Sequence, residues 1–167
     1  MGAPRQDSGA SNAGAVVLFY DGSSVVGAVS AASADGRVLG DGSAALLGTA
    51  LASGDLDGDG VEDLLIGGPG AYSSAGAAWV VRHAPVGDLL ASDADHSLRG
   101  GYSGGGAGTG LTLLADQDGD GFGEVAVGAW FGSVATYTLN GVVSIWPYRP
   151  SFLDVDGDGL VLSLIHI

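Results

Sequence analysis

The chain has 167 residues, of which 46% are hydrophobic and 32 are glycine, and it has no cysteine. This apolar content excludes a disordered chain, and the lack of cysteine excludes disulfides and thiolate metal sites. The net charge is −14, from 19 acidic residues against 5 arginines and no lysine. We therefore expect no binding to nucleic acid. We also expect no membrane insertion, because no apolar run approaches the roughly 20 residues that span a bilayer.

Three short apolar segments follow one template, a glycine followed by strand-forming residues, at 14–19, 76–81 and 141–146. Their starts are 62 and 65 residues apart, and two acidic loops, which begin at Asp55 and Asp116, are 61 residues apart. Two independent markers thus share one period. A unit of this length accommodates about four short strands, which is one blade of a β-propeller.

We therefore predict an all-β fold, a partial β-propeller of about two and a half four-stranded blades over residues 1–147. The predicted blade units span residues 1–45, 46–107 and 108–147. Residues 148–161 are predicted to form a linker and the start of an out-of-phase acidic module, because Pro147 and Pro150 interrupt the strand pattern. Residues 162–167 match no part of the repeat and read as the translation of a sequencing-library adapter, so we exclude them from fold reasoning.

Twelve of the 19 acidic residues lie in three short segments, which indicates cation binding rather than a solvated surface. In the two in-phase loops, carboxylates stand at positions 1, 3, 5 and 9, and an apolar residue stands at position 7. These residues are Asp55, Asp57, Asp59, Val61 and Asp63 in the first loop, and Asp116, Asp118, Asp120, Phe122 and Glu124 in the second.

Oxygen ligands at alternating positions of a curled loop suit Ca²⁺, which takes six to eight of them, and argue against zinc and copper. Glycine at position 6, Gly60 or Gly121, permits the sharp turn. Position 7 is predicted to offer its backbone carbonyl and to turn its side chain into the core. Magnesium fits less well, because it binds few carboxylates and retains several waters.

Two other interpretations share the opening of this motif. An EF-hand needs a glutamate at position 12 and helices on both sides, whereas Ile66 and Val127 stand there and the flanks are strand-like. Alternatively, the loops are polar Asp-Gly turns without metal. A third loop has carboxylates at its first three odd positions, and we treat it as a weaker metal candidate: Asp154, Asp156 and Asp158.

The stretch from Gly54 to Pro69 resembles an FG-GAP repeat, the blade unit of integrin α-chain propellers, and residues 116–129 resemble a second copy. Leu47-Gly48 and Thr109-Gly110 occupy the place of the Phe-Gly pair that gives the family its name. The resemblance implies an extracellular or cell-surface, secreted propeller of bacterial type that holds Ca²⁺ in its loops. The acids at positions 1, 3, 5 and 9 match the family's ligands.

We expect no enzyme activity. Residues 101–105 fit G-x-S-x-G, but a glycine-rich run follows instead of the required helix. His83 and His96 are expected at the surface or in turns, and Trp79 and Trp146 between blades. The predicted function is a calcium-binding scaffold for adhesion or for recognition of a protein or glycan ligand. The alternative is a non-catalytic propeller region of a larger secreted hydrolase or phospholipase.

Overall fold

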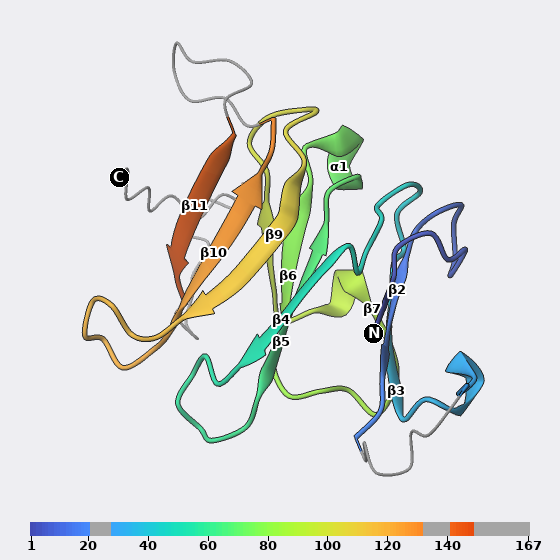
Figure 1. Ribbon diagram of the computed structural model, residues 1–167, viewed down its shortest axis with the longest axis horizontal. Coiled ribbons are helices and arrows are strands. Elements are labelled where there is room, and N and C mark those ends of the chain that lie inside the picture. The colour runs from blue at the N-terminus through green and yellow to red at the C-terminus, as the bar shows by residue number, and fades with distance from the viewer. Residues whose placement is uncertain (21–27, 132–140, 149–167) are drawn as a thin grey trace.

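The computed structural model describes residues 1–20, 28–131 and 141–148, and almost all of its regular structure is β-strand (Figure 1). Within these residues, the one α-helical turn is α1 (Ala71–Ser74), and the two 3₁₀ turns are η1 (Ala31–Ser33) and η2 (Ala91–Asp93). The strands, in chain order, are β1 (Gly2–Ala3), β2 (Ala15–Leu18), β3 (Gly36–Leu39), β4 (Ala50–Gly54), β5 (Asp63–Gly68), β6 (Ala77–Val81), β7 (Gly87–Leu90), β8 (His96–Arg99), β9 (Ala107–Leu114), β10 (Glu124–Ala129) and β11 (Val142–Pro147).

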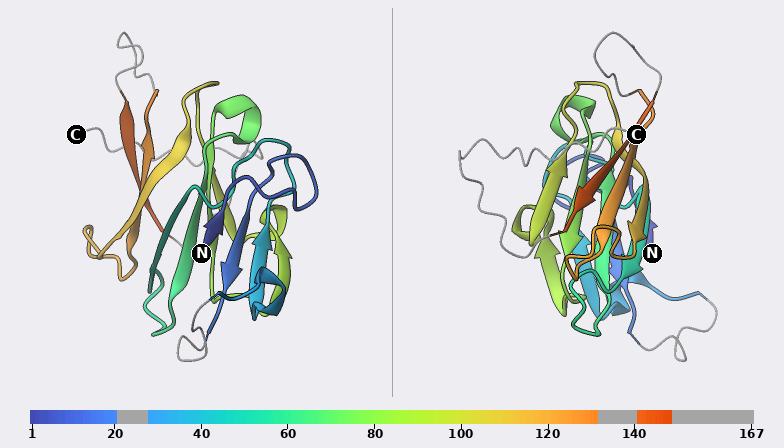
Figure 2. Two further views of the ribbon diagram at one scale, coloured as in Figure 1. Left: turned by 45° about the vertical axis from the view of Figure 1, so that its right-hand side comes forward. Right: turned by 90° about the vertical axis from the view of Figure 1, so that its left-hand side faces the viewer.

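The strands form three sheets that stand side by side like the leaves of a fan (Figures 1 and 2). Their strand orders are β1-β2-β3-β7, β4-β5-β6-β8 and, within the described residues, β9-β10-β11. Pairing inside each sheet is antiparallel, except that β3 and β7 are parallel. The described part of the chain therefore confirms an all-β fold, a partial β-propeller.

The second sheet is a complete blade, and the first repeats only part of it. The pairing of Gly2 with Val16 in the first sheet corresponds to that of Gly67 with Ala78 in the second. The strands β1, β2 and β3 thus correspond to β5, β6 and β8. The fourth strand of the first sheet is β7, which comes from the segment between β6 and β8. One short strand of the second repeat therefore crosses to the sheet of the first.

Two hydrophobic clusters pack between the three sheets, one on each face of the middle sheet. Trp79 and Ile66 belong to the cluster shared with the first sheet, while Val80 and Leu65 belong to the cluster shared with the third. Because successive residues of a strand point to opposite faces, β6 is apolar throughout and β5 is apolar from Leu64 to Gly68. Trp146 packs against the second cluster, so the predicted packing of Trp79 and Trp146 between blades is confirmed.

Each sheet also meets its neighbour through a close approach of glycine backbones. Gly14 forms a parallel bridge with Leu47, and Gly76 forms the same bridge with Ala107. Both glycines have positive φ, 84° and 81°, a conformation that disfavours a side chain. The partner of Leu47-Gly48 in the next repeat is therefore Ala107-Gly108, and its assignment to Thr109-Gly110 was wrong by two residues.

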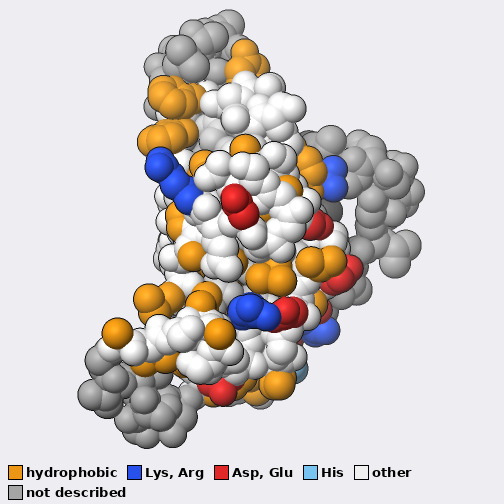
Figure 3. Space-filling view, turned by 90° about the vertical axis from the view of Figure 1, so that its right-hand side faces the viewer, with side chains coloured by type: hydrophobic (Ala, Val, Ile, Leu, Met, Phe, Trp, Pro, Cys, Tyr) orange, Lys and Arg blue, Asp and Glu red, His pale blue; other side chains and the backbone are white. Residues whose placement is uncertain are grey.

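Basic and acidic side chains are scattered over the side of the molecule that lies at the right in Figure 1, without one dominant sign (Figure 3). Hydrophobic and uncharged side chains alternate over it, and acidic groups are scattered singly (Figure 3). The two acidic loops lie instead at one common end of the second and third sheets (Figure 1). The fold thus gathers much of the negative charge at the edge where these two sheets meet.

Candidate metal sites

Both acidic loops are tight connections between two antiparallel strands. The first joins β4, which ends at Gly54, to β5, which begins at Asp63, and the second joins β9 to β10. Within the loops, Gly58 and Gly60 have φ of 76° and 85°, and their counterparts Gly119 and Gly121 have 79° and 91°. Strands on both sides contradict the EF-hand alternative, which requires helices.

The carboxylate at position 1 organises each loop. Asp55 accepts hydrogen bonds from the backbone N–H groups of Gly58 (2.8 Å), Asp59 (3.1 Å) and Gly60 (2.9 Å). Asp116 accepts the corresponding three bonds in the second loop, from residues 119, 120 and 121. At the turn, the backbone N–H groups no longer pair with a neighbouring strand, and the carboxylate accepts their hydrogen bonds instead. This explains why aspartate stands at the start of each loop.

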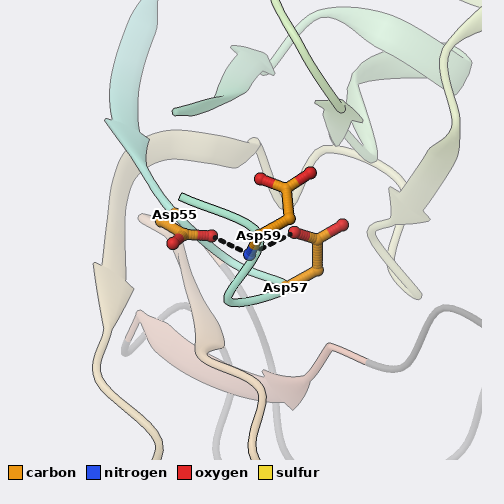
Figure 4. A group of neighbouring side chains, drawn as sticks. All are labelled: Asp55, Asp57 and Asp59. Atoms are coloured by element: carbon orange, nitrogen blue, oxygen red, sulfur yellow. Dashed lines mark hydrogen bonds between the residues drawn. The ribbon is translucent and has the colours of Figure 1, made fainter. Parts of the chain in front are cut away.

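The carboxylates at positions 1, 3 and 5 converge. Asp55, Asp57 and Asp59 each offer an oxygen within 4.8 Å of the other two, and Asp116, Asp118 and Asp120 do the same. In Figure 4, the carboxylates of Asp55 and Asp57 both accept a hydrogen bond from the backbone N–H of Asp59. The structure thus brings together three of the four acids predicted for each loop.

The acids at position 9 lie apart from these groups and are buried. Asp63 is 0% exposed and Glu124 4%. Asp63 accepts hydrogen bonds from the backbone N–H groups of Leu56 (3.0 Å) and His83 (3.3 Å). Glu124 accepts from the N–H of Gln117 through both oxygens. Burial raises the pKa of Asp63, and the two backbone N–H donors partly offset this rise.

The two apolar residues at position 7 differ in their surroundings. Phe122 packs against the cluster between the second and third sheets, as predicted, but Val61 is 46% exposed, so its predicted burial was wrong. Their backbone N–H groups donate to Asp120 (3.0 Å) and Asp59 (2.8 Å) respectively. The two loops are therefore alike in backbone and different in packing.

Sequence reasoning missed two basic neighbours of the first loop. His83 Nε2 lies 2.6 Å from an oxygen of Asp59, and Arg82 lies 3.5 Å from Asp57 and 3.5 Å from Asp95. The hydrogen bond lowers the pKa of Asp59 and raises the pKa of His83. No local signal marks this contact, because both residues follow β6 and reach the loop only through strand pairing.

The donor set suits a hard cation. Each loop presents three clustered carboxylates that are open to solvent at least in part, and within the described residues these two are the groups of acids and histidines able to hold an ion. The ligands are all oxygens, which favours calcium over zinc or copper. The third acidic loop, with Asp154, Asp156 and Asp158, lies outside the described residues.

The remaining candidates are the G-x-S-x-G stretch and His96. Residues 101–105 form a turn between β8 and β9, no helix follows them, and Ser103 donates a hydrogen bond to the carbonyl of Ser73 (3.0 Å). His96 was expected at the surface or in a turn, but it lies partly buried in β8 with its ring edge against Tyr148. Across the described part of the chain, helices are too short to cross a membrane.

Comparisons with known proteins agree with this architecture. The FG-GAP repeat family matches residues 47–81, which cover β4, the first acidic loop, β5 and β6. Integrin alpha-PS2 of Drosophila melanogaster is 36% identical over 103 residues, 56% of this chain. Integrin alpha-5 of Xenopus laevis is 33% identical over 119 residues, 66% of this chain. The matches span 7% and 11% of these relatives. The chain is therefore an FG-GAP, integrin-alpha-like part of a β-propeller.

Proposed function

We propose that this chain is a non-catalytic, calcium-binding propeller scaffold that works outside the cell and presents a surface for a protein or glycan ligand. The observation that carries the proposal is the convergence of three carboxylates in each of two loops that repeat at one period. Exposed acids alone form such groups without metal. Here the same group recurs between equivalent strands, in a chain whose first copy matches the FG-GAP family.

Calcium would supply positive charge at the point where the acids converge. Asp55, Asp57 and Asp59 would bind it in the first loop together with the carbonyl of Val61, and the remaining proposed ligand, Asp63, lies apart from these groups in this structure. In the second loop, Asp116, Asp118 and Asp120 would bind it together with Phe122 and Glu124. Residues at positions 1 and 5 also accept backbone N–H groups of the turn, so these bonds supply part of the order of the loop and the ion would supply the rest.

The physical role of the ion follows from charge. Three carboxylates within 4.8 Å of each other repel, and a divalent cation converts this repulsion into attraction. Each loop leads directly into β5 or β10, which lie in the middle of their sheets. Stabilising the loop therefore stabilises the blade. Extracellular modules of this kind function with Kd of about 10⁻⁴ to 10⁻³ M, a range that extracellular calcium fills and cytosolic calcium does not.

Thermal unfolding of the full chain with 2 mM CaCl₂ and with excess EDTA tests the proposal. We expect calcium to raise the melting temperature and magnesium to raise it much less. The paired variant Asp57→Asn with Asp118→Asn serves as the control, because each asparagine retains an oxygen for the backbone bond and loses the charge. An identical transition in calcium and in EDTA for the wild-type chain would refute structural calcium.

A further inference from the structure

The two acidic loops touch. The backbone N–H of Gly123, at position 8 of the second loop, donates a 2.8 Å hydrogen bond to the carbonyl of Leu56, at position 2 of the first. A Cβ at Gly58 would lie 3.6 Å from the carbonyl oxygen of Gly121, so the loop backbones are also neighbours at their turns. The backbones of the two loops, and hence the two candidate sites, therefore contact each other directly.

Two hydrogen bonds and the peptide bond between Gly123 and Glu124 link the buried acid of one loop to that of the other. The N–H of Leu56 donates to Asp63, and its carbonyl accepts from Gly123. The next residue after Gly123 is Glu124, which holds the N–H of Gln117. The backbone of Leu56 is thus held by Asp63 of the first loop through its N–H and by Gly123 of the second loop through its carbonyl.

Side-chain packing strengthens the same link. Leu56 is 1% exposed and lies in the cluster that Phe122 packs against, together with Tyr148. The N–H of Tyr148 donates to the carbonyl of Gly123 (3.2 Å), and the rings of Phe122 and Tyr148 meet edge to face. Gln117 stands at position 2 of the second loop, as Leu56 does in the first, and its side chain is exposed.

We propose that the two loops are coupled through the Leu56–Gly123 contact, so that calcium bound in one loop raises the affinity of the other. This inference rests on the proposed calcium binding. An ion that orders the first loop fixes Leu56, and Leu56 in turn fixes the backbone of Gly123. The second ion then orders a loop that is already partly ordered, which is positive cooperativity. Repulsion between the two bound ions opposes this cooperativity, and salt at physiological ionic strength screens the repulsion.

Calcium titration calorimetry on the full chain at 0.15 M salt measures the coupling. Asp57→Asn disables the first site, so that only the second binds calcium. Asp118→Asn disables the second site, so that only the first binds calcium. The coupling factor is the product of the two binding constants in the wild-type chain divided by the product of the isolated constants. We expect a factor of about five or more, the lower end of the usual range for coupled sites.

Leu56→Ala, placed in the same three backgrounds, leaves the backbone bond to Gly123 but removes the side-chain packing that holds it, and it should lower the factor toward one while each site still binds. Gln117→Ala removes a side chain at the same loop position without touching the other loop and should leave the factor unchanged. If Leu56→Ala does not fold, judged by circular dichroism in calcium, Phe122→Leu tests the same link, and Gln117→Ala again serves as the control.

The outcomes separate the two proposals. Binding at both sites with a factor of one or less in the wild-type chain overturns the coupling and leaves the proposed function intact. A factor that Leu56→Ala and Phe122→Leu leave unchanged overturns the assigned route and therefore the inference. Absence of calcium-dependent heat in the wild-type chain overturns the proposed function and the coupling with it.

Discussion

Gly67 of β5 and Gly108 of β9 lie so close that a Cβ on Gly67 would overlap the carbonyl oxygen of Gly108. The overlap involves backbone, which cannot rotate away. We therefore expect Gly67→Ala to lower the free energy of unfolding by about 1–3 kcal/mol, as overpacking does elsewhere. Gly110→Ala is the matched control, because no heavy atom lies within 4 Å of its Cβ position and its φ is not positive. Urea unfolding of both variants checks this, and equal effects would contradict the predicted tight contact.

The two functions of the loop acids, holding the turn and binding the ion, are separable by mutation. Asp55 accepts three backbone N–H groups and Asp57 only one. In EDTA, Asp55→Ala should lower the free energy of unfolding by about 1–2 kcal/mol, and Asp57→Ala by less than half as much. In calcium, both variants should lose the stabilisation that the ion gives. Urea unfolding in both buffers measures this, and an Asp57→Ala variant that responds to calcium as the wild type does would count against its role as a ligand.

His96 makes stability depend on pH in a defined direction. Burial against Tyr148 lowers its pKa below the ordinary value; Asp95 opposes this shift and Arg82 adds to it. The folded chain therefore prefers the neutral imidazole. The resulting stability is present above pH of about 6.5 and is lost as the pH falls through the lower folded pKa.

His96→Gln should accordingly flatten the decline in unfolding free energy between pH 7.5 and 5.5. The measurement is urea unfolding in EDTA, so that calcium binding does not contribute to the slope. His83→Gln is the comparison, because the pKa of His83 is raised and its removal should change the slope in the opposite sense. Parallel pH profiles for wild type and His96→Gln would show that the imidazole does not titrate differently on folding.

The strand that crosses between repeats should depend little on its ion pair. Arg37 of β3 forms a two-point pair with Asp88 of β7, with both distances 2.7 Å, but both side chains are more than a third exposed. A double-mutant cycle with Arg37→Ala and Asp88→Ala should give a coupling energy below about 1 kcal/mol. The parallel backbone bonds of β3 and β7 then carry the attachment. A coupling energy above about 2 kcal/mol would show instead that the ion pair contributes substantially to the attachment of β7.

Much of the fold was accessible from the sequence because the repeat carries two markers at one spacing. The segments expected at 76–81 and 141–146 are strands β6 and β11, with ends shifted by at most one residue. The crossing of β7 to the first sheet was not predicted, since pairing between repeats leaves no periodic signal. The equivalence of Ala107 with Leu47 was missed for a related reason: the bridging glycines, Gly14 and Gly76, lie far from them in sequence.

The candidate sites divide in the same way. Alternating aspartates with glycine at position 6 predicted convergence at positions 1, 3 and 5, because these depend only on local loop geometry. The contacts of Arg82 and His83 with the first loop depend on the register of β5 against β6 and could not be read locally. Likewise, the contact of Phe122 with the ring of Tyr148 and the exposure of Val61 depend on residues outside the loops and could not be read locally.

The most direct test of calcium binding is the number of ions held by the full chain, measured by equilibrium dialysis against calcium at several millimolar. The wild-type chain should bind two more ions than the paired variant Asp57→Asn with Asp118→Asn. Taking the difference removes any contribution from residues 149–167. Equal calcium content in the two proteins, both folded by circular dichroism, would contradict the assignment of the two loops as calcium sites.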